Sequence, residues 1–191
     1  PLADIQLENG PYVFTGNLKL EATGTEEISL SNNINGPTSI TVGGDLIFAR
    51  PAAGNITINN NHATVPVNWL INGNVRYSGT ANASVNWTPG SGSITFATST
   101  AQNIDFRGLS VDNIVSSNTS SSGLTFNSSF TTPSLYVNTN ALGSAATIYF
   151  AGSSTFTIST MNVSGTSSFP VVFKSTNNAQ WLLNNTSLNS V

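Results

Sequence analysis

Residues 40–58 read ITVGGDLIFARPAAGNITI, and this stretch decides the fold. Apolar residues alternate with other residues on both sides of Gly44, and a further alternating pair, Ile56 and Ile58, begins twelve positions after this glycine. Alternation with a period of two is typical of β-strands that bury one face. The stretch therefore predicts three short strands, with bends near Gly44 and Gly54.

The same pattern occurs three times, around Gly16, Gly44 and Gly73, so the repeats are 28 and 29 residues long. A repeat of this length made of short strands indicates stacked β-coils rather than a closed globule. The alternation also places the three glycines on the inward face of their strands. We therefore predict that they are corners of the coil that point into the core, where a side chain would not fit.

The apolar pairs continue after residue 90 at less regular spacing. Residues 94–97 and 148–151 are similar in sequence and lie 54 positions apart, which suggests a separation of two coils. The stretches 118–123 and 138–144 are rich in turn-forming residues, and we expect both to loop out of the stack.

We predict an all-β fold, a parallel β-helix (β-solenoid), right-handed, with about six to seven coils of roughly 28 residues. The prediction is a single domain over residues 1–191, with regular coils in 1–90 and less regular coils with longer loops in 91–191. A β-sandwich, which also has many short strands, is the alternative. Stacked coils require the constant spacing between glycine and next strand, whereas a sandwich does not.

The chain carries little charge. Charged residues make up 7% of it, against roughly 25% in typical soluble proteins, and the net charge is −3 with five Lys and Arg residues. So few cations leave no basic patch for a phosphate backbone, and we do not expect nucleic acid as a partner. No apolar run approaches the ~18 residues of a membrane span, and the absence of cysteine excludes disulfides and thiolate metal sites.

No catalytic, cofactor-binding or metal-binding residue can be assigned from the sequence. One outward column of the regular repeats contains Asn17, Asp45 and Asn74, so its single carboxylate has no second acid for metal binding or acid–base catalysis. The single histidine, His62, lies in a turn-like segment, and we expect it to be a solvated loop residue.

The candidate surface site consists of Asp105, Arg107 and Asp112. Asp105 and Arg107 lie two residues apart on the same outward face of a predicted strand, and Asp112 follows shortly after them. A local surface ion pair is the simpler interpretation, and a catalytic or binding acid is the alternative.

Aromatic rings exposed on a β-helix can stack on sugars. However, Trp69 and Trp87 fall on inward positions of the repeat, and Trp181 does so by analogy, so we expect all three in the core. Threonines recur in the middle of apolar pairs, but equivalent positions in neighbouring repeats are not threonine, which argues against a flat ice-binding face.

The two ends of the predicted solenoid differ. Five of the eight acidic residues lie in the first 27 positions, whereas the stretch from Trp181 to Val191 carries no charge and contains strand-like apolar residues. Terminal coils expose unpaired backbone and apolar core unless they are capped. We expect that the chain is part of a longer solenoid or that another chain completes its C-terminal end.

Three stretches carry a resemblance to a known class of proteins: VGGDL at 42–46, INGNV at 71–75, and VSGT leading into PVVFKS within 163–175. With them, and over about residues 12–183, the chain resembles the secreted parallel β-helix proteins of bacteria, which include filamentous-haemagglutinin-like adhesins. The resemblance is architectural, and a shared fold does not pass on an activity. It implies export, display outside the cell, and adhesive or structural work.

We therefore expect a non-enzymatic protein of the extracellular space or bacterial cell surface: a solenoid segment or subunit of a fibre, sheath or adhesin that assembles end to end. The expected partners are further copies or neighbouring solenoid segments at the C-terminal end. A second hypothesis is a glycan-binding adhesin or phage-fibre module that uses residues 118–123. A polysaccharide lyase or hydrolase and an ice-binding protein come third. We expect no cofactor and no membrane insertion.

Overall fold

The computed structural model describes residues 3–8, 10–25, 27–32, 39–51, 53–61, 65–79 and 84–187. These residues form nineteen strands and one short helix, α1 (Thr139–Leu142). The strands pair in parallel and make three sheets, which we call A, B and C. The sequence also predicts a bend near residues 35–37, which lies outside the described residues.

Each sheet consists of strands from successive coils. Sheet A contains β1 (Ala3–Leu7), β4 (Ile28–Asn32), β7 (Ile56–Asn59) and β10 (Val85–Thr88). Sheet B contains β2 (Pro11–Phe14), β5 (Ser39–Val42), β8 (Asn68–Ile71), β11 (Ser93–Phe96), β13 (Asn113–Ser116), β15 (Thr131–Asn138), β17 (Thr155–Ser164) and β19 (Leu182–Asn184). Sheet C contains β3 (Leu18–Glu21), β6 (Leu46–Ala49), β9 (Val75–Ser78), β12 (Gln102–Ile104), β14 (Leu124–Phe126), β16 (Ala146–Phe150) and β18 (Val171–Ser175).

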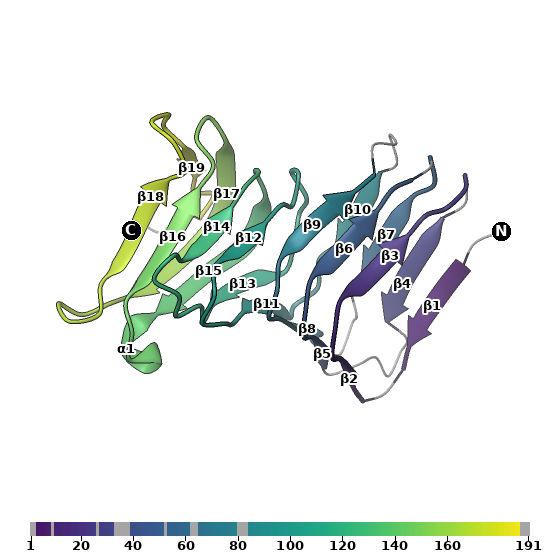
Figure 1. Ribbon diagram of the computed structural model, residues 1–191, viewed down its shortest axis with the longest axis horizontal. Coiled ribbons are helices and arrows are strands. Elements are labelled where there is room, and N and C mark those ends of the chain that lie inside the picture. The colour runs from purple at the N-terminus through teal and green to yellow at the C-terminus, as the bar shows by residue number, and fades with distance from the viewer. Residues whose placement is uncertain are drawn as a thin grey trace.

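The architecture is a parallel β-solenoid of about six turns with about 26 residues per turn. Successive strands of one sheet come from successive coils, and the coils follow one another along the long axis from β1 at one end to β18 and β19 at the other (Figure 1). Parallel neighbours need a long return path, which here is the rest of the coil. The predicted β-solenoid is confirmed, and the β-sandwich alternative is wrong.

The first coils have the length that the glycine spacing predicts. In sheet B, Tyr12 pairs with Ile40, and Ile40 pairs with Trp69, so the successive strands are 28 and 29 residues apart. These coils use all three sheets. Each coil therefore places one short strand on each side of a triangular core.

The following coils are shorter, because sheet A has no described strand after β10. Ile94 pairs with Ile114 and Ile114 pairs with Leu135, so these steps in sheet B are 20 and 21 residues. Later strands of sheet B lengthen instead, to eight residues in β15 and ten in β17.

The equivalence of residues 94–97 and 148–151 is wrong. The first stretch includes Ile94 in β11 of sheet B, whereas the second includes Ile148 in β16 of sheet C. Every side of a coil buries one strand face, so apolar pairs look alike on all sides. Similarity between two such pairs therefore cannot tell which sheet a strand joins.

A continuous column of inward side chains fills the solenoid. Its second half is aromatic: Phe150 stacks against Phe126 at 5.6 Å between ring centroids and against Trp181 at 4.4 Å. In the first half, Trp69 and Trp87 are buried and lie 5.4 Å apart, which confirms their predicted place in the core. Trp181 is partly buried against the same core. Each fully buried aromatic side chain of this kind contributes roughly 1.5–3 kcal/mol.

The repeat glycines lie at the corner between sheets B and C. The Gly44 N–H donates to the Gly16 carbonyl (2.9 Å), and the Gly73 N–H donates to the Gly44 carbonyl (3.1 Å), so the three form an axial column. A Cβ atom on Gly73 would lie 2.5 Å from the Gly44 carbonyl carbon and oxygen, and one on Gly44 would collide with the Asn17 side chain.

The prediction that these glycines point into the core is wrong. Gly16 is exposed, and a Cβ atom there would meet no heavy atom within 4 Å. At Gly44 and Gly73 the missing side chain would collide with the preceding corner rather than with core side chains. The alternation of strand faces does not extend through a bend. Extending it to the corner glycines therefore placed them on the wrong face.

We predict that Gly73→Ala lowers the free energy of unfolding by about 2 kcal/mol, because the new methyl group overlaps backbone that cannot move aside. Gly16→Ala is the matched control, since it makes the same substitution at an equivalent corner with open space, and its change should stay within about 0.5 kcal/mol. Thermal and denaturant unfolding measure both. Equal stability of the two variants would contradict the axial contact.

Candidate functional site

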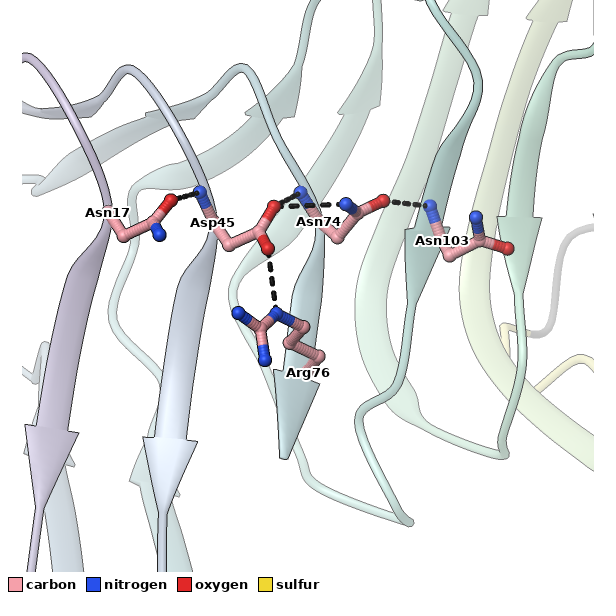
Figure 2. A network of polar contacts seen from close by, with 5 residues as sticks. All are labelled: Asn17, Asp45, Asn74, Arg76 and Asn103. Atoms are coloured by element: carbon pink, nitrogen blue, oxygen red, sulfur yellow. Dashed lines mark hydrogen bonds and ion pairs between the residues drawn. The ribbon is translucent and has the colours of Figure 1, made fainter. Parts of the chain in front are cut away.

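Polar side chains form a continuous column beside the glycine corner. Asn17, Asp45, Asn74 and Asn103 lie in a row across successive coils (Figure 2). The side-chain oxygen of each residue accepts the backbone N–H of the next: Asn17 from Asp45 (2.7 Å), Asp45 from Asn74 (2.9 Å), and Asn74 from Asn103 (2.8 Å). The column therefore ties each corner to the next with side-chain hydrogen bonds.

Asp45 is the charged member of this column. Its Oδ1 also accepts from the Asn74 Nδ2 (2.9 Å), and its Oδ2 pairs with the Arg76 Nε (2.7 Å) (Figure 2). Burial alone would raise the pKa of Asp45, but the hydrogen bonds from the Asn74 backbone, Arg76 and the Asn74 side chain outweigh it and lower the pKa below 3.8. The carboxylate is therefore engaged as a structural acceptor.

We predict that Asp45 stabilises the fold in a pH-dependent way. Because folding lowers the pKa of Asp45, its contribution is present above about pH 3.8 and is lost as the pH falls through the lower native pKa. Asp45→Asn keeps an oxygen for the Asn74 N–H, so it should cost less than about 1 kcal/mol at neutral pH and remove this part of the acid sensitivity.

Asp45→Ala is the comparison, since it leaves the Asn74 N–H without its acceptor and should cost about 1–2 kcal/mol at neutral pH. Unfolding measured between about pH 5 and about pH 2 compares the three proteins. If Asp45→Asn kept the full acid sensitivity of the parent, Asp45 would not be the group responsible.

The structure brings Asp105 and Arg107 together on the surface. The Asp105 Oδ2 and the Arg107 Nε are 3.0 Å apart, and the Arg107 guanidinium lies 4.1 Å from the ring centroid of Tyr77. Burial raises the pKa of Tyr77 to about 12, Asp105 adds to the shift, and the guanidinium groups of Arg107 and Arg50 oppose it. The pair thus packs against a tyrosine that stays neutral.

Asp112 does not share this site. Its side chain is fully buried, and its Oδ2 accepts from the Asn60 Nδ2 (2.7 Å) and the Trp87 Nε1 (2.8 Å), while its Oδ1 accepts from the Gly90 N–H. The prediction that it belongs to a surface cluster is wrong. Asp112 instead lies against β10, the last described strand of sheet A, and satisfies three donors where the coil changes shape.

We predict that Asp112→Asn destabilises the protein by roughly 1–3 kcal/mol, because an amide NH₂ would face donors that now bind a carboxylate oxygen. Asp105→Asn makes the same change in an exposed ion pair and should cost at most about 1 kcal/mol. Chemical unfolding of the parent and the two variants measures the loss of unfolding free energy in each. Similar costs for both variants would show that the buried carboxylate is not required as an acceptor.

Residues 118–123 do not loop out of the stack. Asn118 is buried, and its Nδ2 donates to the Gln102 Oε1 (3.0 Å) and the Thr100 carbonyl (2.9 Å). Gln102 in turn donates to the carbonyls of Ile71 (2.9 Å) and Gly73 (2.7 Å). The prediction of a protruding loop is wrong because these polar side chains pair inside the coil rather than with water.

Residues 138–144 form a helical turn. Asn138 caps α1 by accepting the Ala141 N–H (3.1 Å), and Gly143 ends the turn in the left-handed conformation. Thr139 is buried, and its hydroxyl donates to the Phe169 carbonyl. The segment is therefore attached to the next coil on one side.

Two hollows were not predicted. One, of about 420 Å³, crosses three coils and is lined by Gly108, Ser129, Phe130, Thr131, Ser153, Ser154, Thr155 and Thr157. The other, of about 290 Å³, lies at the coil formed by β17, β18 and β19 and is lined by Met161, Val163, Phe173, Trp181 and Leu183. Because each hollow combines residues of separate coils, no local sequence signal marks it.

The described part of the chain has no cluster of metal-binding side chains. There, no three His, Cys, Asp or Glu side chains lie close enough together to hold one metal ion. His62 lies outside the described residues. Among those residues, no helix has the length and apolar character needed to cross a membrane.

The fold defines a class: the chain is a parallel β-solenoid built on axial polar and apolar columns. Comparisons with protein-family models, with curated proteins and with solved structures found no match.

Proposed function

We propose that the chain is a non-enzymatic structural element of an extracellular or cell-surface assembly, such as a fibre, sheath or adhesin. In this proposal it joins a further β-coil, from a second copy or a neighbouring solenoid segment, at the coil formed by β18 and β19. The observation that carries the proposal is the open apolar face of this coil.

The open face consists of large apolar side chains. Leu182, Leu183 and Val163 are 59%, 37% and 39% exposed, and Leu183 and Val163 line the apolar hollow of about 290 Å³. Exposed apolar groups next to one another are typical of surfaces that bind a partner. Residues 188–191 are outside the described part of the chain, so the face is defined by the residues that precede them.

The backbone at this face supports the same proposal. Strands β18 and β19 are the outermost described strands of sheets C and B. An outermost strand presents N–H and C=O groups to which another strand can pair. A parallel strand placed there would continue ladders that already run through seven strands of sheet C and eight of sheet B.

The aromatic side chains of the core also support association at the coil formed by β18 and β19. Phe150 contacts Phe173 at 5.8 Å and Trp181 at 4.4 Å, and both of these rings are only partly buried. In the preceding coils, Phe126 and Phe150 are fully buried because a following coil covers them. An added coil would bury Phe173 and Trp181 in the same way.

The carboxylates along the sides of the solenoid support a structural role. Asp45, Asp105 and Asp112 each hold hydrogen bonds or ion pairs within the chain. A catalytic acid or base instead needs to reach a reacting group in a substrate. These carboxylates serve the stacking of coils and the packing of Tyr77 and Trp87.

We predict that the protein self-associates in a concentration-dependent manner and that Leu182→Lys with Leu183→Lys abolishes association. Two ammonium groups at this face would have to be desolvated for a coil to pack on it. Analytical ultracentrifugation over a wide range of protein concentration measures the effect. The melting temperature of the variant should stay close to that of the parent, because both leucines are already exposed.

Ser99→Lys is the matched control, because it adds charge at an exposed turn between β11 and β12, away from the open face. This variant should associate like the parent. A parent protein that stays monomeric at every concentration, or a double lysine variant that associates as strongly as the parent, would refute association through this coil.

A further inference from the structure

We propose that the hydroxyl-lined hollow on the side of the solenoid binds a neutral saccharide. The hollow is lined by corners and adjoining strand residues of three successive coils: Gly108 from one, residues 129–131 from the next, and residues 153–155 with Thr157 from the third. Its volume of about 420 Å³ lies within the range of roughly 300–1,000 Å³ that is usual for small-ligand sites.

The hydroxyl groups of the hollow are available to a ligand. Five serine and threonine side chains that line it make no hydrogen bond within the described residues: Ser129, Thr131, Ser153, Ser154 and Thr155. The sixth hydroxyl, that of Thr157, accepts from the Asn184 Nδ2 (3.4 Å). Each free hydroxyl offers one donor and two acceptor positions, which suits the hydroxyl groups of a sugar.

The backbone at the margin of the hollow is held in an unusual conformation. Arg107 (φ 50°) and Ser153 (φ 64°) are the two non-glycine residues with positive φ in the described part of the chain. Ser153 lines the hollow, and Arg107 precedes Gly108, which also lines it. Such conformations are strained and cluster at binding sites. Both non-glycine residues with a left-handed backbone conformation therefore lie beside the same hollow.

The lining residues favour a neutral ligand. None of them is charged, and the Arg107 side chain beside the hollow is directed to Asp105 and Tyr77. Phe130 is 2% exposed, and its ring packs on Phe106 and Phe156 in the core. The hollow thus presents mainly hydroxyl groups above a packed core, without an ion to attract a charged group.

The site is independent of the proposed association. It lies along the side of the coils, at corners and the adjoining residues of β15 and β17, whereas association uses the apolar face at β18 and β19. Its place also differs from the predicted glycan loop at residues 118–123, whose Asn118 is buried. A solenoid of this kind could display the hollow on an assembled surface.

The test uses the full chain and three neutral disaccharides, cellobiose, lactose and N,N′-diacetylchitobiose, at millimolar concentration. Backbone amide NMR should show shifts confined to Gly108, residues 129–131 and residues 153–157 for at least one of them. A sulfated disaccharide serves as the charged probe and should bind more weakly. Self-association is measured separately, so either proposal can fail alone.

Thr131→Val removes one lining hydroxyl with almost no change in shape, and it should weaken binding several-fold. Thr125→Val, on the outer face of β14, is the matched control and should bind like the parent. Ser154→Leu fills the hollow and should abolish the shifts. Absence of binding by all three disaccharides, tighter binding of the sulfated probe, or unchanged binding by both hollow variants would each overturn the proposal.

Discussion

The structure depends on one constraint: the backbone of every coil must find its hydrogen-bond partners in the coils before and after it. All of the strand ladders are parallel and connect successive coils. Strands of one sheet lie about 4.8 Å apart, so side chains at equivalent positions are forced into columns. The residue type that fits at a position therefore depends mainly on the residues at the equivalent positions of the preceding and following coils. Core aromatics, corner glycines and the row from Asn17 to Asn103 are three results of this rule.

The same constraint explains where charge is tolerated. Asp45 occupies a place that asparagine takes in the neighbouring coils, and it needs Arg76 as an additional partner. Asp112 is buried, yet its three donors come from Asn60, Trp87 and Gly90, which lie where sheet A ends. A buried carboxylate without such donors would be costly. The change from three-sided to shorter coils is thus accompanied by a buried carboxylate that accepts from donors beside β7 and β10, the last two described strands of sheet A.

Stacking also separates the two proposed activities in space. An added coil must meet the apolar face of β18 and β19, because there the core rings and the sheet edges are open. The corners of successive coils are also linked, for example by the Gly108 N–H, which donates to the Ser129 carbonyl (2.8 Å), but their side chains differ from coil to coil. The hollow near Ser129 and Ser154 is lined by residues of three successive coils on this side of the solenoid. A scaffold function at the end and a binding function at the side are therefore compatible.

The sequence by itself determined the repeat, the strand positions and the inward residues of the regular coils, because period-two alternation and the glycine spacing depend only on neighbours along the chain. It also determined that Trp69 and Trp87 are core residues. Only the tertiary structure decided which sheet each later strand joins, the axial rather than inward contacts of Gly44 and Gly73, and the burial of Asp112 and Asn118. The physical reason is that these features depend on contacts between coils 16 to 52 residues apart, such as Asn118 with Gln102 and Asp112 with Asn60, and no local pattern encodes such contacts.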